Sequence, residues 1–536
     1  MRASRPRNRI PVIDLFAGPG GLSEGFDRFR LPSGIQRFKI RLSIENDAFA
    51  YATLLLRSFF RQFSGRQVPE EYYDYLRGRI DRDQLFEKYA SEAERAYREV
   101  WHATLGGRGL KHSVVRQRIR TALDGANDWV LLGGPPCQAY SLVGRSRMRG
   151  IDYDAYEADH RHFLYKEYLR IIADHSPPVF VLENVKGLLS SVVRGEHTFQ
   201  RILEDLRNPR AVFPHADVFS SGLTYGLFPF SHSNSLFGEF CHRDYVVRTE
   251  EHGIPQARHR ILVLGVRGDV LEKNVPGTLK NGRYPVPLAK ILYDVPPVRS
   301  GLSKPSPRRQ DWFNWVQYAA RSQWLRDPIL TPATRNEIIK TVSELDSTLN
   351  TGGAFVPKRR RKIRFARNWF TDERLGGFCN HEARSHMPSD LHRYLFAAAF
   401  AKAQGRSPKL SDFPSRLLPD HKNVQKDVAE TIFSDRFRVQ IASREATTIT
   451  AHISKDGHYF IHPDPAQCRS LTVREAARLQ TFPDNYLFEG PRTEQFKQVG
   501  NAVPPLLALQ VAEVVSALFA HPKPRTQKGT QVKSVR

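Results

Sequence analysis

The sequence predicts a doubly wound α/β protein, in which a largely parallel sheet is covered by helices on both faces. Short apolar runs alternate with segments of helical character along much of the chain. A glycine-rich turn directly follows the first apolar run. Both features are typical of chains in which strands and crossover helices follow one another. The runs lack polar alternation, which indicates strands that are buried on both sides.

The predicted elements begin in the order strand, turn, helix, strand, helix. Residues 10–16 (IPVIDLF) form the first strand, which ends before Gly18-Pro19-Gly20-Gly21, and LSEGFDRFR follows as a helix. The run FKIRLSIE, which ends at Glu45, predicts the second strand, and NDAFAYATLLLRSFF predicts the second helix. Further buried strands are predicted at 128–132, 179–183 and 260–266, with the helix FLYKEYLRIIADH before the second of them.

Two stretches interrupt this alternation. Residues from about 61 to 127 are charged, aromatic and helical in character, and the stretch from 268 to 446 holds Pro- and Ser-rich turns. We therefore expect a first α/β part at 1–267 with a helical insertion at about 61–127, a separate domain at 268–446 and a second α/β part at 447–520. The tail at 521–536 is basic, has no apolar period and is expected to be disordered.

The charge balance predicts a polyanionic partner. The 536 residues include 81 Lys and Arg against 56 Asp and Glu, which gives a net charge of +25. Nucleic acid is the first expectation and an anionic membrane surface the second. A basic run such as KRRRKIR at 358–364 neutralises phosphates, although such runs are also common on solvated faces. The chain shows no secretory signal and no apolar run of about 20 residues, so we expect a cytoplasmic protein without a membrane segment.

The cysteines and histidines do not predict a metal site. Four cysteines are scattered without a CxxC pair, so neither a zinc ribbon nor a disulfide framework is indicated. This usage favours a reducing compartment. Cys379, His381, His386 and His392 lie close together, but their spacing is not that of a zinc protease, and we expect no metal there.

Two motifs carry side chains suited to chemistry. In GGPPCQAYS (133–141) two prolines stiffen the turn after a strand and fix the direction of Cys137. A cysteine beyond the carboxyl end of a parallel strand lies where such folds bind substrates, although a free cysteine is also a common buried apolar residue. Glu45 ends the second strand, where an acid accepts hydrogen bonds from a ribose or begins the next helix.

Further motifs follow in a fixed order and carry a family resemblance. FAGPGG, GPPCQ, ENV, QARHR, REAARLQ and VGNAVPP succeed one another along the chain. In this order the set closely resembles the DNA cytosine-5 methyltransferase family, over roughly 10–60, 128–267 and 447–520. The resemblance implies a class I S-adenosylmethionine-dependent methyltransferase sheet, with a second, variable DNA-recognition domain at 268–446. It also implies methyl transfer to C5 of cytosine in double-stranded DNA.

The resemblance implies roles for individual residues. Cys137 would add to C6 of cytosine as a covalent nucleophile, and Glu183 would hold or protonate the N3 edge. Asn184 would orient the loop that holds one of them, and Arg260, with Arg258, would meet the O2 side of the base and nearby phosphate. Substrate contacts are expected from Pro136, Gln138 and Ser141. The polar segment 142–162 fits a mobile loop that closes over the extruded base.

The resemblance also implies S-adenosylmethionine as cofactor. Phe16 would lie against the adenine, unless it is simply a core residue, and the turn with Gly18, Gly20 and Gly21 beneath the methionine part. Glu45 would bind the ribose and Asn501 would close the pocket. The sequence departs from the family at one point. The family places an aspartate about twenty residues before GPPCQ, to meet the adenine, whereas KHSVVRQRIRTALDGAND in this chain has no clear equivalent.

Two other functions remain open from the sequence. A relative of the same chemistry could act on RNA, and an inactive relative could serve as a DNA-binding regulator. Incubation with labelled cofactor and either DNA or tRNA tests the RNA alternative. Covalent trapping on 5-fluorocytosine DNA tests the alternative of an inactive regulator. The expected partner is double-stranded DNA, with an association to the nucleoid if the protein is bacterial. Restriction or phage-defence proteins are further expected partners.

Overall fold

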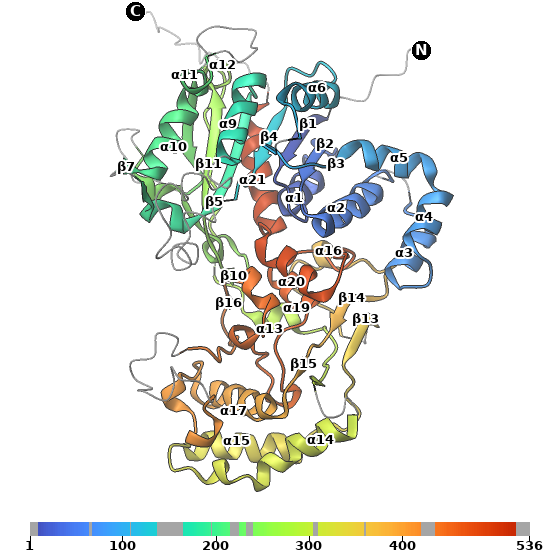
Figure 1. The fold of residues 1–536 in the computed structure, drawn as a ribbon, viewed down its shortest axis with the longest axis vertical. Helices are drawn as coiled ribbons and strands as arrows, with labels where there is room; N and C mark the ends of the chain where they lie inside the picture. The colour runs from blue at the N-terminus through green and yellow to red at the C-terminus, as the bar shows by residue number, and fades with distance from the viewer. Residues whose placement is uncertain are drawn as a thin grey trace, which may run out of the picture.

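The computed structural model describes residues 9–63, 67–107, 109–136, 164–193, 196–214, 224–231, 240–282, 284–303, 309–358, 361–419 and 435–520. Figure 1 shows an upper α/β body that contains the central sheet and a lower helical lobe, joined by a narrower middle part. A group of short helices projects from the body on the right of the same view.

The central sheet has the strand order β3-β2-β1-β4-β5-β11-β8, with β9 paired to β11. Its strands are β1 (Ile10–Leu15), β2 (Phe38–Glu45), β3 (Val100–His102), β4 (Val130–Gly133), β5 (Val179–Val185), β8 (Tyr225–Pro229), β9 (Val246–Arg248) and β11 (His259–Arg267). The pairs from β3 to β5 are parallel. The strand predicted at 260–266 is β11, which runs antiparallel to both β5 and β8.

Helices cover both faces of this sheet, because successive side chains of each strand point to opposite sides. Ile13 and Leu15 of β1 belong to one core, which includes side chains of α6 (His112–Leu123), α9 (Leu164–His175) and α10 (Thr198–Arg207). Ile10 and Val12 belong to the other core, with α1 (Gly21–Arg28) and α21 (Pro505–Leu518). The predicted doubly wound α/β class is confirmed.

The segment at 61–127 is only in part an insertion. Helices α3 (Glu70–Leu76), α4 (Arg82–Lys88) and α5 (Ala90–Glu99) follow α2 (Ala48–Arg61) and project from the body (Figure 1). Strand β3 and helix α6 lie in the same stretch, but they belong to the central sheet and its cover. Of the expected insertion, the three short helices are the part that stands outside the central sheet and its cover, and β3 is too short to give a strand signal of its own.

The lower lobe has a core of its own. It is built from α14 (Arg309–Tyr318), α15 (Pro332–Ser343) and α17 (Pro388–Gln404), together with side chains from Phe437 to Cys468. This lobe differs in two places from the domain expected at 268–446. Ile461 and Cys468 lie in the core of the lobe, although they follow residue 446. Ile363, Trp369 and Phe370 instead pack near α21 of the body.

Shorter elements connect the body and the lobe. The hairpin of β13 (Gly352–Pro357) and β14 (Gly377–Glu382) runs between them. The remaining helices and strands are β6 (Val192–Val193), β7 (Glu196–His197), α11 (Pro209–Val212), β10 (Gln256–Ala257), α12 (Gly268–Leu271), α13 (Leu288–Leu292), β12 (Gly301–Leu302), α16 (Arg367–Phe370), β15 (Ser385–His386), β16 (Ala446–Thr447), α19 (Val473–Leu479) and α20 (Arg492–Asn501).

The last two helices combine length and apolar composition. The stretch Arg492–Leu518 is apolar enough to cross a membrane by composition, but 67% of its most apolar window is buried inside the protein. Its partners include α1, against which α21 packs in the core. Burial of this kind is that of a core helix.

Candidate active site

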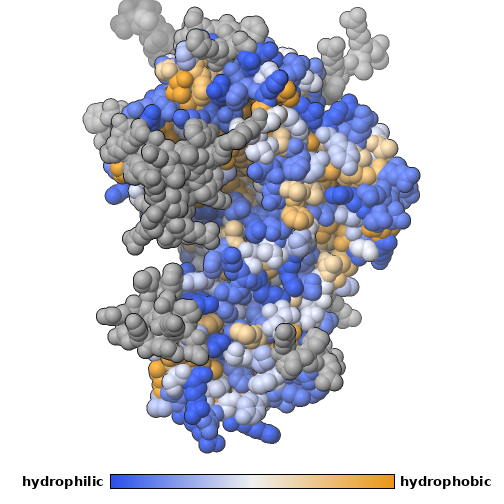
Figure 2. All heavy atoms as spheres, viewed as in Figure 1, coloured by the Kyte–Doolittle hydropathy of each residue, from blue (hydrophilic) through white to orange (hydrophobic). Residues whose placement is uncertain are grey.

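A cavity of about 1850 Å³ lies at the carboxyl ends of the parallel strands. Its walls come from the turn after β1, the ends of β2, β4 and β5, the segment 447–460 and the residues around α20. In the view of Figure 2 the surface is indented on the left between body and lobe, and the coloured residues at the inner end of the indentation are mostly hydrophilic. Ligands of open α/β sheets bind at this edge.

The glycine turn forms one wall. Gly18 and Gly20 adopt φ values of 56° and 90°, which side chains rarely allow. Gly18 and Gly21 line the cavity, whereas Gly20 faces away from it, where a Cβ atom would lie 2.8 Å from Leu54. A Cβ atom on Gly21 would lie 2.2 Å from the carbonyl oxygen of Val503. The turn thus packs directly against the VGNAVPP segment.

Glu45 holds this turn from the end of β2. Its Oε2 accepts a hydrogen bond from the Gly18 amide (2.7 Å), and its Oε1 accepts bonds from the amides of Asn46 (2.9 Å) and Asp47 (2.8 Å). Burial raises the pKa of Glu45 above its ordinary value, while these backbone bonds lower it. The carboxylate lines the cavity and fixes the backbone on both sides of it.

Asp14 is a buried acid that the sequence pattern did not reveal. Its carboxylate accepts a hydrogen bond from the Ser23 hydroxyl, and within the described part of the chain its Oδ1 has no hydrogen-bond partner. Burial raises the pKa of Asp14 to about 6. Because a buried polar atom is costly without a partner, the orphaned oxygen in this cavity wall indicates a ligand that donates hydrogen bonds there.

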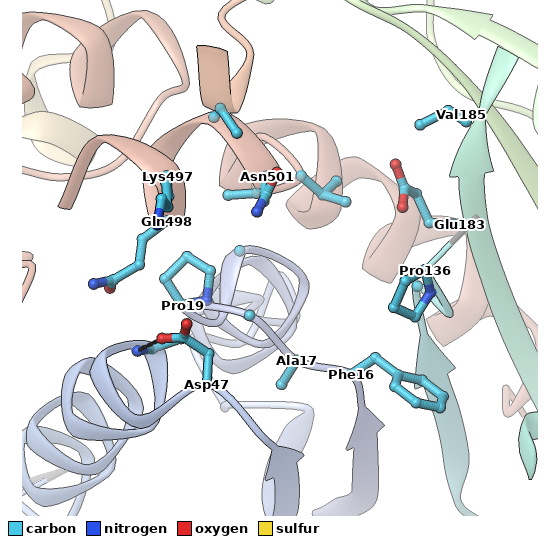
Figure 3. Close-up of a pocket in the computed structure, with 18 of the residues that line it drawn as sticks. Phe16, Ala17, Pro19, Asp47, Pro136, Glu183, Val185, Lys497, Gln498 and Asn501 are labelled. Carbon is cyan, nitrogen blue, oxygen red and sulfur yellow. Dashed lines mark hydrogen bonds between the residues drawn. The ribbon is translucent and has the colours of Figure 1, made fainter. Parts of the chain in front are cut away.

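Glu183 and Arg260 meet on neighbouring strands. The antiparallel pairing of β5 with β11 places Arg260 opposite Val185, and its Nε lies 3.1 Å from Oε1 of Glu183. Burial raises the pKa of Glu183, while Arg260 and Arg258 lower it. Figure 3 shows the Glu183 carboxylate above Pro136, on the opposite side of the view from Lys497 and Gln498.

Asn184 ties this pair to the turn after β4. Its Nδ2 donates to the carbonyl oxygen of Pro135 (3.3 Å), and its Oδ1 accepts from the amide of Val185 (2.7 Å). Pro136, the last described residue of the turn, lines the cavity. The expected nucleophile Cys137, together with Gln138, Ser141 and the loop at 142–162, lies outside the described residues.

Arg258 differs from the role that we expected. Its side chain is only 1% exposed, and its terminal nitrogens donate to the carbonyl oxygens of Ile449 (2.6 Å) and Gly500 (3.0 Å). A guanidinium that is buried in this way does not reach a phosphate. Arg258 lines the cavity, but its contacts hold two walls together.

Phe16 and Asn501 line the cavity from different elements. Phe16 has a φ of 54°. It lines the cavity and also packs against a core of the sheet, so its position suits both a contact with adenine and a role in the core. In Figure 3 its ring lies below Pro136. Asn501 ends α20 and is exposed, and in the same view it lies above Pro19 of the glycine turn.

The sequence motifs missed a group of wall residues on the side of the lobe. Their segments, 438–460 and 494–498, carry polar and basic side chains without a recognisable spacing: Arg438, Thr447, Thr448, Thr450, His452, Lys455, Tyr459, Lys497 and Gln498. The loop after β3 contributes Ala103 to Gly107 to the same cavity. Only the fold brings these segments to the motifs, so sequence spacing gave no signal.

The cysteine and histidine group serves the packing of the middle part and the lobe. Cys379 Sγ donates to the carbonyl oxygen of Leu76 (3.5 Å). The ring nitrogens of His381 bond to Thr472 Oγ1 (3.0 Å) and to the carbonyl oxygen of Pro296 (2.8 Å). A ring nitrogen of His392 bonds to the carbonyl oxygen of Trp315 (2.8 Å).

Comparison with known proteins decides the family. The model of the C-5 cytosine-specific DNA methylase family matches residues 89–209 and 242–517. The chain belongs to this family. It is 34% identical to the type II methyltransferase M.Bpa9945I of Bacillus paralicheniformis, over 94% of this chain and 98% of that protein. It is 27% identical to the type II methyltransferase M.AgeI of Thalassovita gelatinovora, over 73% of this chain and 83% of that protein.

A solved structure resembles this DNA methylase over most of its length. A protein described as a DNA modification methyltransferase, encoded within a prophage of Escherichia coli, superposes with a TM-score of 0.49 and 16% identity, over 95% of this chain and 99% of that chain. The family membership confirms the resemblance drawn from the motifs, and it makes the chain a DNA (cytosine-5-)-methyltransferase.

Proposed function

We propose that this enzyme transfers the methyl group of S-adenosylmethionine to C5 of cytosine in double-stranded DNA through a covalent adduct on Cys137. The observation that carries the proposal is the Glu183–Arg260 pair, which lies beside Pro136 in the same cavity as the glycine turn and Glu45. Cys137 is the next residue after Pro136.

The cavity suits the cofactor at several points. The orphaned Oδ1 of Asp14 suits a group that donates hydrogen bonds, such as the ammonium of the methionine part. Gly18 and Gly21 line the cavity without side chains, so the backbone of the turn would face the ligand directly. Glu45 and Asn501 would hold the ribose and close the pocket. The bound cofactor supplies an electrophilic methyl group.

The reaction needs a nucleophile because C5 of cytosine is a poor one. The Cys137 thiolate would add to C6, and this bond breaks the aromaticity of the ring and makes C5 enamine-like. C5 then takes the methyl group, a base removes the C5 proton, and elimination of the thiolate restores the ring. The target base must leave the helix for this, at a cost of a few kcal/mol.

Glu183 and Arg260 would stabilise the base as charge develops on it. Burial raises the pKa of Glu183 and so favours a protonated carboxyl that donates to N3. The Arg260 guanidinium, held 3.1 Å from Glu183, would face the O2 side. Asn184 keeps the proline turn beside them through its bond to Pro135. Arg258 would act indirectly, because its hydrogen bonds hold two walls of the cavity together.

The basic residues support DNA as the substrate. Arg438, Lys455 and Lys497 lie on the cavity wall. Arg361, Lys362, Arg364 and Arg367 surround a second, shallow pocket with Tyr293. Side chains of this kind neutralise phosphates and give salt-dependent affinity. The segment at 268–446, with the lobe helices, would read the target sequence.

The direct test is covalent trapping on 5-fluorocytosine DNA in the presence of S-adenosylmethionine. The wild-type enzyme is expected to form a stable adduct, because fluorine blocks the loss of the C5 substituent. Cys137→Ser is expected to form none, and Cys241→Ser, which removes an exposed cysteine, is the matched control. An adduct in the Cys137→Ser variant would refute the role of Cys137. Labelling of tRNA but not DNA would favour the RNA alternative.

We also propose a setting in the bacterial cytoplasm, within a restriction-modification system. The names of the relatives as type II methyltransferases support this. Bisulfite sequencing of DNA from cells that express the protein would give the methylated site. We expect an accompanying nuclease to cleave that site in unmethylated DNA and to leave it intact in methylated DNA. Absence of such a nuclease would overturn the setting without affecting the chemistry.

A further inference from the structure

The inserted helices share a core with the hairpin that leads to the lobe. Leu375, which lies just before β14, and Cys379, which lies within it, are fully buried. They pack in one cluster with side chains of α2 and of all three inserted helices. Figure 1 shows α3 beside β14 on the right of the molecule, whereas the indentation in Figure 2 lies on the left.

Two arginines cross between the partners in opposite directions. Arg77, which follows α3, donates to the carbonyl oxygens of Leu375 (3.3 Å) and Arg374. Arg374 donates to the carbonyl oxygen of Val68 and to Glu70 Oε2 (3.0 Å). Glu70 Oε1 in turn accepts from Arg77 (2.6 Å). Each segment thus satisfies backbone carbonyls of the other.

An aromatic residue completes the junction. The guanidinium of Arg374 stacks over the Tyr73 ring, 4.5 Å from its centroid. The Tyr73 hydroxyl donates to Asp372 Oδ2 (2.9 Å), which also accepts from Asn485 (2.8 Å). Arg57 of α2 donates to Asn485 Oδ1 (3.3 Å). A continuous polar chain therefore runs from the insertion to α2, which begins at the cavity wall.

The hairpin is one of the paths by which the chain leaves and re-enters the lobe. Helix α15 precedes β13, and β14 leads through β15 to α17, and these two helices pack together in the lobe core. The strands are paired from one end to the other, Gly352 with Glu382 and Pro357 with Gly377, with no pair given by Ala354 and Asn380 between them. Contacts that hold the hairpin in place therefore help to set the position of the lobe relative to the cavity.

We propose that the inserted helices α3–α5 are a brace that positions the recognition lobe, with Arg77 and Arg374 as its positioning residues. The brace lies on the side of the middle part away from the open indentation. It sets the distance between the DNA-reading side chains of the lobe and the methyl-transfer site. This inference rests on the proposed function for its kinetic consequences.

The test is steady-state kinetics of an Arg77→Ala/Arg374→Ala double variant. We expect the KM for DNA to rise about ten-fold, because a misplaced lobe weakens productive DNA binding. We expect kcat at saturating DNA to stay within about two-fold and the Kd of S-adenosylhomocysteine to stay unchanged, since neither arginine lines the cavity. Hydrogen exchange of the β13 and β14 amides is expected to become faster.

The matched control is Arg79→Ala. The side chain of Arg79, which follows α3, is 65% exposed and pairs with Asp74 of that helix. Tyr73→Phe removes only the bond to Asp372 and should shift KM in the same direction if the double variant fails to fold. An unchanged KM, or a loss of kcat at constant KM, would overturn the brace. If the wild-type enzyme makes no 5-methylcytosine, the proposed function fails, and hydrogen exchange alone decides the brace.

Discussion

The Glu183 side chain shows how much of this site depends on one ionisable group. Its side chain is 13% exposed, one of its oxygens is paired with Arg260, and desolvation raises its pKa. A carboxyl in this setting can retain a proton and give it to a base edge, or withdraw it as charge changes. An amide of the same shape keeps the contact but cannot change its charge.

Glu183→Gln is therefore expected to lower kcat by about 10² to 10⁴, the usual size of a general acid contribution. The measurement is single-turnover methylation with labelled cofactor. Glu251→Gln changes an exposed acid that pairs with Arg248 and should leave the rate unchanged. A Glu183→Gln enzyme as fast as the parent would remove this residue from the chemistry.

Gly21 gives a second prediction at the scale of one atom. A Cβ atom there would lie 2.2 Å from the Val503 carbonyl oxygen, so Gly21→Ala must displace backbone. We expect a loss of about 1–3 kcal/mol of unfolding free energy, as for overpacked cores, and weaker binding of S-adenosylhomocysteine. Urea unfolding and calorimetry measure the two effects. Gly109→Ala, with open space around its Cβ position, should change neither.

At the scale of elements, a short parallel ladder joins the QARHR motif to the C-terminal part. β10 pairs with β16, and Gln256 Oε1 accepts from the Ile449 amide (2.8 Å). Arg258 adds bonds to the carbonyl oxygens of Ile449 and Gly500. The motif therefore acts as a joint between three segments that lie far apart in the sequence.

Arg258→Ala should loosen this joint and leave two buried carbonyl oxygens without donors. We expect a loss of about 2–4 kcal/mol of unfolding free energy, from two lost charge-assisted hydrogen bonds. Urea unfolding followed by circular dichroism measures it. Arg248→Ala is the control and should cost almost nothing, because the Arg248 side chain is 57% exposed. Equal stability of both variants would show that the joint does not depend on Arg258.

The elements also show what sequence reasoning reaches. The glycine turn and the strand ends that carry Glu45, Pro136 and Glu183 were predicted because motif and apolar run coincide at each. Sequence reasoning missed Asp14 because this residue lies within the apolar run that predicts the first strand. Arg258 and Arg260 look equivalent in the motif, but the backbone bends between β10 and β11, where the Arg258 amide donates to the Gln256 carbonyl oxygen.

At the scale of the whole molecule, buried histidines lie where the lobe meets the middle part. Burial lowers the pKa of His381 to about 4, and the pKa of His462 is also lowered to about 4, chiefly by burial. In the unfolded chain these rings titrate near about 6.5. The folded state thus binds fewer protons than the unfolded state between these values, and stability falls as pH falls through this window.

We expect the unfolding midpoint in urea to be constant above about pH 7 and to drop steadily between about pH 6.5 and 4. His381→Gln should flatten part of this slope, because it removes one proton uptake site of the unfolded chain. His112→Gln is the control, since His112 is exposed. A parent protein whose midpoint does not change across this window would contradict the assignment of neutral buried rings.

The contact between Gly21 and Val503 has a consequence for the timing of synthesis. One wall of the cavity, the expected methyl-donor site, is made by the first turn of the chain and by residues translated almost 500 positions later. At about 5–20 residues per second, the ribosome adds the second half of this contact tens of seconds after the first. A nascent chain with every upstream motif already folded still lacks that wall, so modification of the genome can begin only once translation has passed the final helix.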